Sequence, residues 1–102
     1  MAIWRVEYEK PVRKQIADGI RAGSITQEDL EVIEKWVDLI EKFGPEQIQN
    51  DRTWYDHELF ENWKGHRSSA FHFKGRIIYR IEGARVVVVV VKITKDHDYG
   101  RK

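Results

Sequence analysis

The groups in this chain best suited to chemistry are its histidine side chains. Imidazole titrates near neutral pH, so one histidine can accept a proton and a second can donate one during the transfer of a phosphoryl group. Metal binding is the other chemistry that histidines offer, but no two of them have the i, i+4 spacing of a zinc-binding helix, and the chain has no cysteine. We therefore expect neither a metal nor a cofactor. The histidines are His57, His66, His72 and His97, and a structural role is open for each of them taken singly.

Positive charge, which phosphates require, is concentrated towards the C-terminus. Residues 1–50 hold seven Lys/Arg against ten Asp/Glu, a net charge of −3, whereas residues 65–102 hold nine against three, a net charge of +6. The sum over the whole chain is only +1. A basic half of this kind suits a phosphate-bearing partner, although Lys and Arg are also common on exposed strand faces.

The composition is that of an ordered globular protein. Hydrophobic residues make up 41% and charged residues 34% of 102 residues, with only two prolines, so residues 1–102 are expected to form one domain. No run approaches the roughly 18 apolar residues of a membrane helix, and the N-terminal segment has charges where a signal peptide would be apolar. We expect a cytoplasmic protein with no membrane association.

The first half of the sequence predicts one strand and two helices. Residues 3–8 alternate in polarity as a half-buried strand does. Pro11 fits the first turn of a helix that Gly23 ends. Thr26 can cap a second helix, which runs to residue 43 and carries a wide apolar face. Residues 46–64 are expected to be irregular or briefly helical.

The second half predicts three strands, at residues 66–73, 76–82 and 85–94, joined by two-residue turns at Lys74-Gly75 and Gly83-Ala84. The six valines at 86–91 break the alternation of a half-buried strand. Their strand should therefore be covered on both faces or paired on both edges. The expected fold is α+β: an N-terminal strand, a two-helix hairpin, and a three-stranded antiparallel meander with the helices packed on one face of the sheet.

A two-residue turn at Lys74-Gly75 would fix which side chains share a face of the hairpin. One face would alternate guanidinium groups with aromatic rings, as surfaces for phosphates and unstacked bases do. The other face, small and apolar, would lie under the helices. The first set is Arg67, Ser69, Phe71, Phe73, Arg76 and Arg80; the second is Ser68, Ala70, His72, Ile77, Tyr79 and Ile81.

Three segments together resemble a known family. They are "DHELFENWKGHR" (residues 56–67), "GRIIYRIEG" (residues 75–83) and, after a hydrophobic strand, the terminal "HDY" (residues 97–99). The chain resembles the RelE/ParE superfamily of type II toxins and is closest in pattern to the YafQ- and YoeB-like ribosome-dependent mRNA interferases. The expected order of strands and helices agrees with that fold, so the resemblance extends over nearly all of the chain.

The resemblance implies roles for four residues. His57, eight residues before Gly65, matches a position that would take the proton from an RNA 2′-hydroxyl. Arg76, eleven residues after the same glycine, matches the arginine that steadies the scissile phosphate. His97 matches the general acid for the leaving 5′-oxygen, and Tyr99 the terminal aromatic residue.

The chain also departs from the pattern. An additional active-site histidine of YafQ-like proteins falls at Ala70, and the Asp-Trp pair that follows it falls at Lys74 and Gly75. Asp98 stands beside His97, where its carboxylate could raise the pKa of the imidazole or repel the RNA backbone.

The implied activity is that of a toxin from a type II toxin–antitoxin system, a metal-independent endoribonuclease that cleaves mRNA on the ribosome by attack of the RNA 2′-hydroxyl. The implied partners are mRNA on the ribosome and a cognate antitoxin. The implied assembly is a homodimer or a toxin–antitoxin hetero-oligomer. Two alternatives stay open: a ParE-like inhibitor of DNA gyrase, and an inactive protein with the same fold. The residues expected to contact RNA are Lys64, Arg67, Phe71, Lys74 and Arg80.

Overall fold

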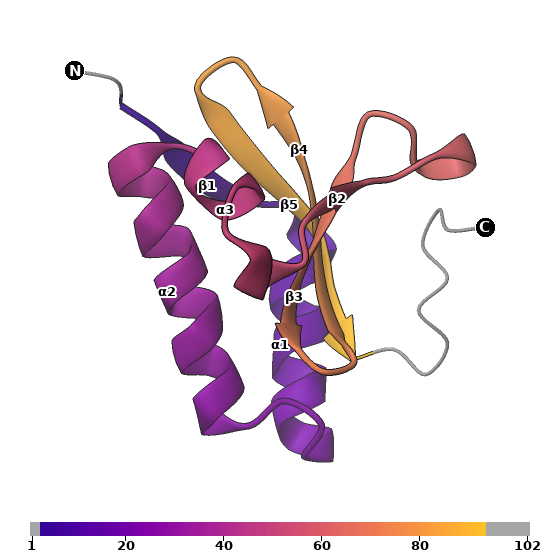
Figure 1. Ribbon diagram of the computed structural model, residues 1–102. Helices are drawn as coiled ribbons and strands as arrows, with labels where there is room; N and C mark the ends of the chain where they lie inside the picture. Colours follow the sequence, from indigo (N-terminus) through magenta and orange to yellow (C-terminus); the bar gives the residue numbers. More distant parts are fainter. Residues whose placement is uncertain (1–2, 94–102) are drawn as a thin grey trace.

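The computed structural model describes residues 3–93 and confirms the predicted order of elements (Figure 1). His97 and Tyr99 lie outside the described residues. The strands form one five-stranded sheet in the order β1-β5-β4-β3-β2. The elements are β1 (Arg5–Tyr8), α1 (Lys10–Ala22), α2 (Gln27–Phe43), α3 (Glu46–Gln49), the 3-10 turn η1 (Arg52–Trp54), β2 (His57–Glu58), the 3-10 turn η2 (Glu61–Trp63), β3 (Arg67–His72), β4 (Gly75–Glu82) and β5 (Arg85–Ile93).

Both long helices begin and end where the sequence signals predicted, within a residue. Pro11 stands in the first turn of α1, and Gly23 ends that helix with a left-handed φ of 81°. At the start of α2, the Thr26 hydroxyl accepts a hydrogen bond from the Asp29 amide, and the Asp29 carboxylate accepts one from the Thr26 amide. This reciprocal cap satisfies two amides that have no partner inside the helix.

The valine strand β5 lies inside the sheet. It pairs in parallel with β1, where Val6 is opposite Val86, and antiparallel with β4. The prediction that this strand would be paired on both edges is therefore confirmed. An irregularity in the pairing of β5, which was not predicted, also explains why the valine run does not alternate with polar residues. Ile78 pairs with Val90 but Tyr79 with Val88, so the register shifts by one residue at Val89. The shift lets Val91, two positions after Val89, reach the same core as Val88.

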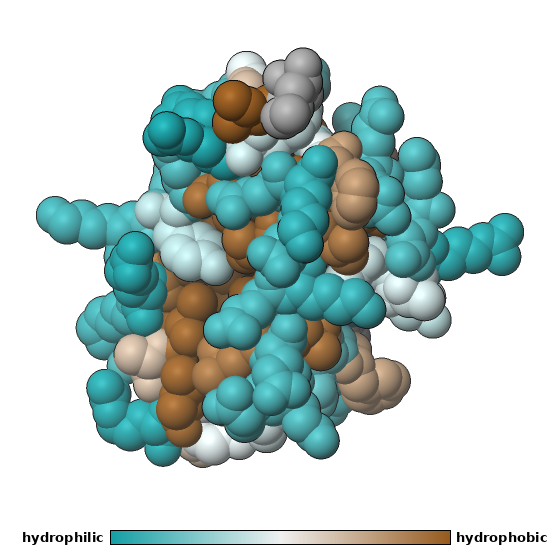
Figure 2. Space-filling model, turned by 90° about the vertical axis from the view of Figure 1, so that its left-hand side faces the viewer, coloured by the Kyte–Doolittle hydropathy of each residue, from teal (hydrophilic) through white to brown (hydrophobic). Residues whose placement is uncertain are grey.

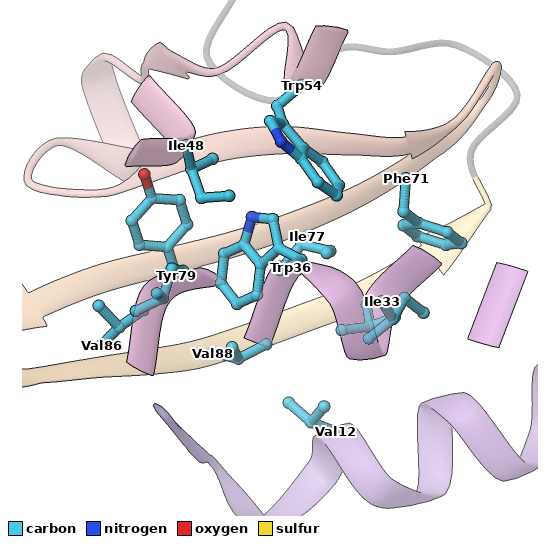
Figure 3. Packing of buried hydrophobic residues seen from close by; sticks show 12 residues of the cluster. Val12, Ile33, Trp36, Ile48, Trp54, Phe71, Ile77, Tyr79, Val86 and Val88 are labelled. Carbon is cyan, nitrogen blue, oxygen red and sulfur yellow. The ribbon is translucent and has the colours of Figure 1, made fainter. Parts of the chain in front are cut away.

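The helices cover one face of the sheet and enclose the core with it (Figure 3). At its centre, Trp36 of α2 meets Tyr79 of β4 edge to face, with the ring centroids 5.3 Å apart. Edge-to-face contacts of this kind add to the stabilisation from burial. From α1, the buried side chain of Val12 belongs to this core. No helix within residues 3–93 is long and apolar enough to cross a membrane.

The predicted register between β3 and β4 is wrong by three residues over residues 67–70. Gly75 belongs to β4 and pairs with His72, so Ser69 lies opposite Ile77 and not opposite Arg80. The two faces of β3 are therefore exchanged, since neighbouring side chains on a strand point to opposite sides. Ser69 and Phe71 lie on the helix side with Tyr79, whereas Ser68 and Ala70 lie on the other side with Arg76 and Arg80.

Packing around Phe71 explains this register. The register is irregular between Ala70 and His72, and Phe71 is buried in the core between them. Gly75 lies so close to its ring that a Cβ atom there would be 2.7 Å from the Phe71 Cζ. Gly75, which the sequence suggested was a turn residue, is thus a strand residue whose missing side chain makes room for the Phe71 ring.

Candidate active site

A cleft of about 920 Å³ brings together several described residues whose side chains can bind or react with a phosphate. It lies between α2, the segment before β2 and the turn that joins β3 to β4. Two residues predicted as catalytic, His57 and Arg76, line it together, although they come from different elements. The lining residues are Val32, Lys35, Thr53, Trp54, Tyr55, Asp56, His57, Ala70, Phe71, His72, Phe73 and Arg76.

His57 is the first residue of β2, and its side chain is exposed. Its Nδ1 atom lies 3.1 Å from the carbonyl oxygen of Tyr55. A carbonyl oxygen can only accept a hydrogen bond, so Nδ1 carries the proton and donates it. In the neutral imidazole, Nε2 is then left with its lone pair. This is the tautomer that a proton acceptor needs.

A buried carboxylate fixes the chain immediately before His57. The side chain of Asp56 is fully buried and accepts hydrogen bonds from Arg67 Nε at 2.6 Å, Ser69 Oγ at 2.7 Å and the Tyr79 hydroxyl at 2.6 Å. The Trp36 Nε1 atom in turn donates to Ser69 Oγ at 3.0 Å. Helix α2 and strands β3 and β4 are thus tied to the segment that carries His57.

The same network affects the acidity of Tyr79. Burial, together with the negative charge of Asp56 and the hydrogen bond to it, raises the pKa of the Tyr79 hydroxyl well above its usual range. The hydroxyl therefore stays protonated and remains a donor to Asp56 at neutral pH.

Arg76 enters the cleft from β4, where it is half-buried and lies opposite Ala70 on β3 and Lys92 on β5. Its Nη1 atom donates to the carbonyl oxygen of Gly75 at 2.9 Å. This contact directs the guanidinium group towards the end of β4 where the cleft lies. A guanidinium group keeps its charge at any physiological pH and can donate several hydrogen bonds to a phosphate.

His72 was expected to be covered by the helices, and this prediction is wrong. The side chain is exposed and lines the cleft. Its Nδ1 atom accepts a hydrogen bond from the Lys74 amide at 3.1 Å, so in the neutral ring the proton sits on Nε2. The two imidazoles of the cleft therefore hold opposite tautomers: His57 offers a lone pair at Nε2, and His72 offers an N–H.

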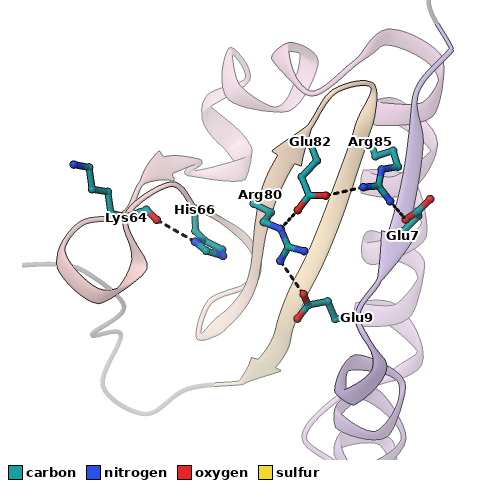
Figure 4. Close-up of polar contacts among 7 residues, drawn as sticks. All are labelled: Glu7, Glu9, Lys64, His66, Arg80, Glu82 and Arg85. Atoms are coloured by element: carbon teal, nitrogen blue, oxygen red, sulfur yellow. Dashed lines mark hydrogen bonds and ion pairs between the residues drawn. The ribbon is translucent and has the colours of Figure 1, made fainter.

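The residues predicted to contact RNA are scattered. Phe71 lines the cleft but is packed in the core, with only 5% of its surface exposed. Arg67 is paired with Asp56. Arg80 forms ion pairs with Glu82 and Glu9, and Glu82 also binds Arg85, on the face of the sheet away from the helices (Figure 4). Lys64, Arg67, Lys74 and Arg80 are not among the described residues that line the cleft.

Three lining residues were missed from the sequence: Lys35, Thr53 and Tyr55. Lys35 could not have been found, because it lies in the middle of α2, far along the chain from the other lining residues. Tyr55 carried a signal, since it is two residues before His57. Within the described residues, no group of three histidine, aspartate or glutamate side chains is arranged to hold a metal ion.

Strand β5 brings the chain to the edge of the cleft. Its final residue, Ile93, pairs with Gly75, and Lys92 pairs with Arg76. His97 is four residues further along the sequence.

Neither a protein-family model nor a curated protein matches the sequence. Solved structures do match. YafQ from E. coli is 15% identical with a TM-score of 0.72 over 89% of this chain and 93% of its own. In the heterotetrameric YoeB–YefM toxin–antitoxin complex from Staphylococcus aureus, the corresponding values are 12%, 0.68, 92% and 100%. For the YoeB/ParE toxin from Agrobacterium tumefaciens they are 16%, 0.64, 89% and 99%.

Proposed function

We propose that this chain, whose fold is that of the RelE/ParE superfamily toxins, is the toxin of a type II toxin–antitoxin system and an mRNA endoribonuclease. The observation that carries the proposal is the meeting of His57 and Arg76 in one cleft. Each was singled out in the sequence as a match, at a fixed distance from Gly65, to a position of the RelE/ParE toxin pattern.

In the proposed reaction the RNA provides its own nucleophile. His57 Nε2 accepts the proton of a 2′-hydroxyl, and the 2′-oxygen attacks the adjacent phosphorus. Arg76 stabilises the negative charge that gathers on the phosphorane oxygens. The bond to the 5′-oxygen then breaks, and that oxygen takes up a proton. The products are a 2′,3′-cyclic phosphate and a 5′-hydroxyl, and no metal is required.

His97 is proposed to protonate the leaving oxygen, with Tyr99 as the terminal aromatic contact. Strand β5 ends at Ile93, which pairs with Gly75, the neighbour of Arg76. Four extended residues span at most about 14 Å, so His97 is close enough in sequence to reach this cleft. His72 adds a second donor, since its Nε2–H can bind a phosphate oxygen. The stabilising charge comes from Arg76, because it lines the cleft and Arg67 and Arg80 do not.

The proposed setting is the cytoplasm, with mRNA bound on the ribosome as substrate. A ribosome that orients the message would compensate for the small number of catalytic groups in the cleft. The proposed second partner is a cognate antitoxin. Figure 2, which views the side of α2, shows hydrophobic side chains between the charged ones on this face. A segment that folds on binding could cover them.

The test is to map transcript ends in cells that express the protein, its H57A and R76A variants, and two controls. R21A removes an exposed arginine of α1, and H66A removes a histidine outside the cleft lining. We expect cuts phased with codons in wild type and in both controls, and their loss in H57A and R76A.

The same experiment separates the alternatives. Growth arrest with intact transcripts would favour a gyrase inhibitor, to which the likeness to the YoeB/ParE toxin gives some weight. In that case H57A would remain toxic. Growth without arrest and without cuts would identify an inactive protein with this fold.

A further inference from the structure

Tyr55 has an unusual position at the mouth of the cleft. Its side chain lines the cleft, and 74% of its surface is exposed. Its backbone is left-handed, with φ 48° and ψ 39°, a conformation that costs energy for any residue with a side chain. Residues held in this way concentrate at binding and catalytic sites, where the surrounding structure forces the conformation.

Contacts on both sides of Tyr55 hold this conformation. Before it, the Tyr55 amide donates to the Arg52 carbonyl at 3.0 Å and closes the turn η1. After it, the buried carboxylate of Asp56 anchors the chain to β3 and β4. Its own carbonyl accepts the hydrogen bond from His57 Nδ1. The ring is therefore presented to solvent from a fixed backbone, directly beside the proposed proton acceptor.

A second exposed ring lines the same cleft. Phe73, in the turn between β3 and β4, has 81% of its surface exposed. Lys35 from α2 and Arg76 from β4 bring positive charge to the lining, and its one carboxylate, Asp56, is paired with Arg67. Aromatic platforms beside cations are the combination that binds single-stranded nucleic acid: bases stack on the rings, and phosphates contact the charges.

We propose that Tyr55, with Phe73, forms a subsite that stacks an unpaired base of the RNA next to the 2′-hydroxyl that His57 deprotonates. This inference rests on the proposed function. Stacking uses the face of a base and not its hydrogen-bonding edge, so this subsite accepts any base and favours the larger purines. Tyr55 is thereby a substrate-positioning residue, separate from the groups that transfer protons.

The decisive probe is a short single-stranded RNA with 2′-O-methyl groups and a central 2-aminopurine. The methyl groups block the attacking oxygen, so the RNA binds without being cut, and the fluorescence of 2-aminopurine falls when the base stacks. We expect quenching with wild type and with Y55F. With Y55G we expect little quenching and a Kd about tenfold higher.

Glycine is the replacement of choice because it adopts a left-handed backbone without strain, so Y55G removes the ring and keeps the fold. The matched control is E61G, since Glu61 is the other described non-glycine residue with positive φ, at 57°, and it lies outside the lining. F60A is a second control, an exposed phenylalanine away from the lining. Both should quench and bind as wild type does.

A cycle with an abasic RNA distinguishes stacking from an indirect effect. Removing the base should weaken binding to wild type about as much as Y55G does, and it should have little further effect on Y55G. Additive losses would overturn the proposal, because ring and base would then act independently. Equal quenching by wild type and Y55G would also overturn it.

The proposed function and the stacking subsite can be tested independently of each other. If wild type cuts transcripts in cells and Y55G cuts them at the same rate and with the same purine bias, the cleavage proposal stands and the stacking subsite is rejected. If H57A still arrests growth without cuts, the cleavage proposal is rejected first. If Y55G loses affinity only for a purified antitoxin and not for the RNA probe, the two rings are part of a protein interface, and the subsite is likewise rejected.

Discussion

At the scale of single residues, Asp56 has the greatest structural influence on the site although it cannot touch a substrate. Its carboxylate receives three hydrogen bonds inside the protein, from Arg67, Ser69 and Tyr79. Replacing it with alanine leaves the half-buried guanidinium group of Arg67 without its partner and two buried hydroxyl groups without an acceptor. Such losses are strongly destabilising, because buried polar groups have no water to bind.

We expect D56A to lower the free energy of unfolding by about 3–5 kcal/mol, measured by urea denaturation. D18A is the matched control. Asp18 pairs with Lys14 and Arg21 on the exposed surface of α1, where such pairs stabilise little, so D18A should unfold nearly as wild type does. Similar unfolding curves for D56A and wild type would show that the buried carboxylate does not hold the segment.

Tyr79 makes the stability of the protein sensitive to alkali. Its pKa is raised in the folded protein, chiefly by burial, from an ordinary value of 10.0. Below about pH 10 the hydroxyl is protonated in both states and its contribution is complete. Above that pH the unfolded chain loses the proton first, so stability falls by up to about 1.4 kcal/mol per pH unit.

Y79F lacks this titration, so we expect the stability difference between wild type and Y79F to shrink as the pH rises above about 10. Urea unfolding at several pH values from 8 to 11 measures it. Tyr8, whose pKa burial also raises, is present in both proteins and does not affect the comparison. A constant difference across this range would contradict the assignment.

His72 tests whether the second imidazole of the cleft takes part in cleavage. Its Nε2–H is available because Nδ1 accepts the Lys74 amide. H72A should reduce the rate of cleavage of a translated message, whereas H72Q, which keeps a side-chain N–H donor, should recover part of it. The rate should fall further in H57A. Equal cleavage rates in wild type and H72A would show that His72 takes no part in cleavage.

At the scale of elements, the position of the cleft depends on the register of one hairpin. His57 and Arg76 could be predicted because each matches, at its distance from Gly65, a position of the pattern that the sequence resembles. The side on which β3 places its residues could not, since it is decided by how the Phe71 ring packs over Gly75. A sequence shows a glycine followed by a strand, but it does not show which neighbouring ring requires the missing Cβ.

G75A tests this account. Its Cβ would meet the Phe71 Cζ at 2.7 Å and the His72 Cβ at 2.8 Å, so the ring, the strand or both must move. We expect a loss of about 1–3 kcal/mol in the free energy of unfolding. We also expect a loss of cleavage activity, because His72 and Arg76 flank the position.

G83A is the control for G75A. Gly83, in the turn at the far end of β4, has a φ of +60° and open space around its Cβ position. Alanine there costs about 1–2 kcal/mol through backbone strain. It should leave cleavage unchanged in the fraction of protein that is folded. If both variants lose activity in proportion to stability alone, Gly75 has no special relation to the cleft.

At the scale of the whole molecule, folding places basic residues from both halves of the chain in one cleft. The cleft gathers Lys35 from α2 and Arg76 from β4, elements that are distant in sequence. The excess of basic residues towards the C-terminus was visible in the sequence. The contribution of a lysine from the acidic N-terminal half was not, because only the folded chain brings the two halves together.

Binding of the 2′-O-methyl RNA should therefore weaken as the salt concentration rises, by an amount that depends on the number of phosphate contacts. Two phosphate contacts predict a slope of about −1.4 for the logarithm of the association constant against that of the salt concentration. R76A should reduce the magnitude of the slope by about 0.7, one contact. R21A, on the exposed surface of α1, should leave the slope unchanged. A slope that R76A does not alter would place the phosphates away from Arg76.

The parallel pairing of β1 with β5 has a consequence for synthesis of the protein. Strand β1 can join the sheet only through β5, the last described strand, which lies between β1 and β4. Until residues 85–93 have emerged from the translating ribosome, β1 has no partner in the sheet and β4 lacks one of its two neighbours. On the proposed function, a nascent chain therefore stays harmless until its valine strand has emerged, which gives an antitoxin an interval in which to arrive.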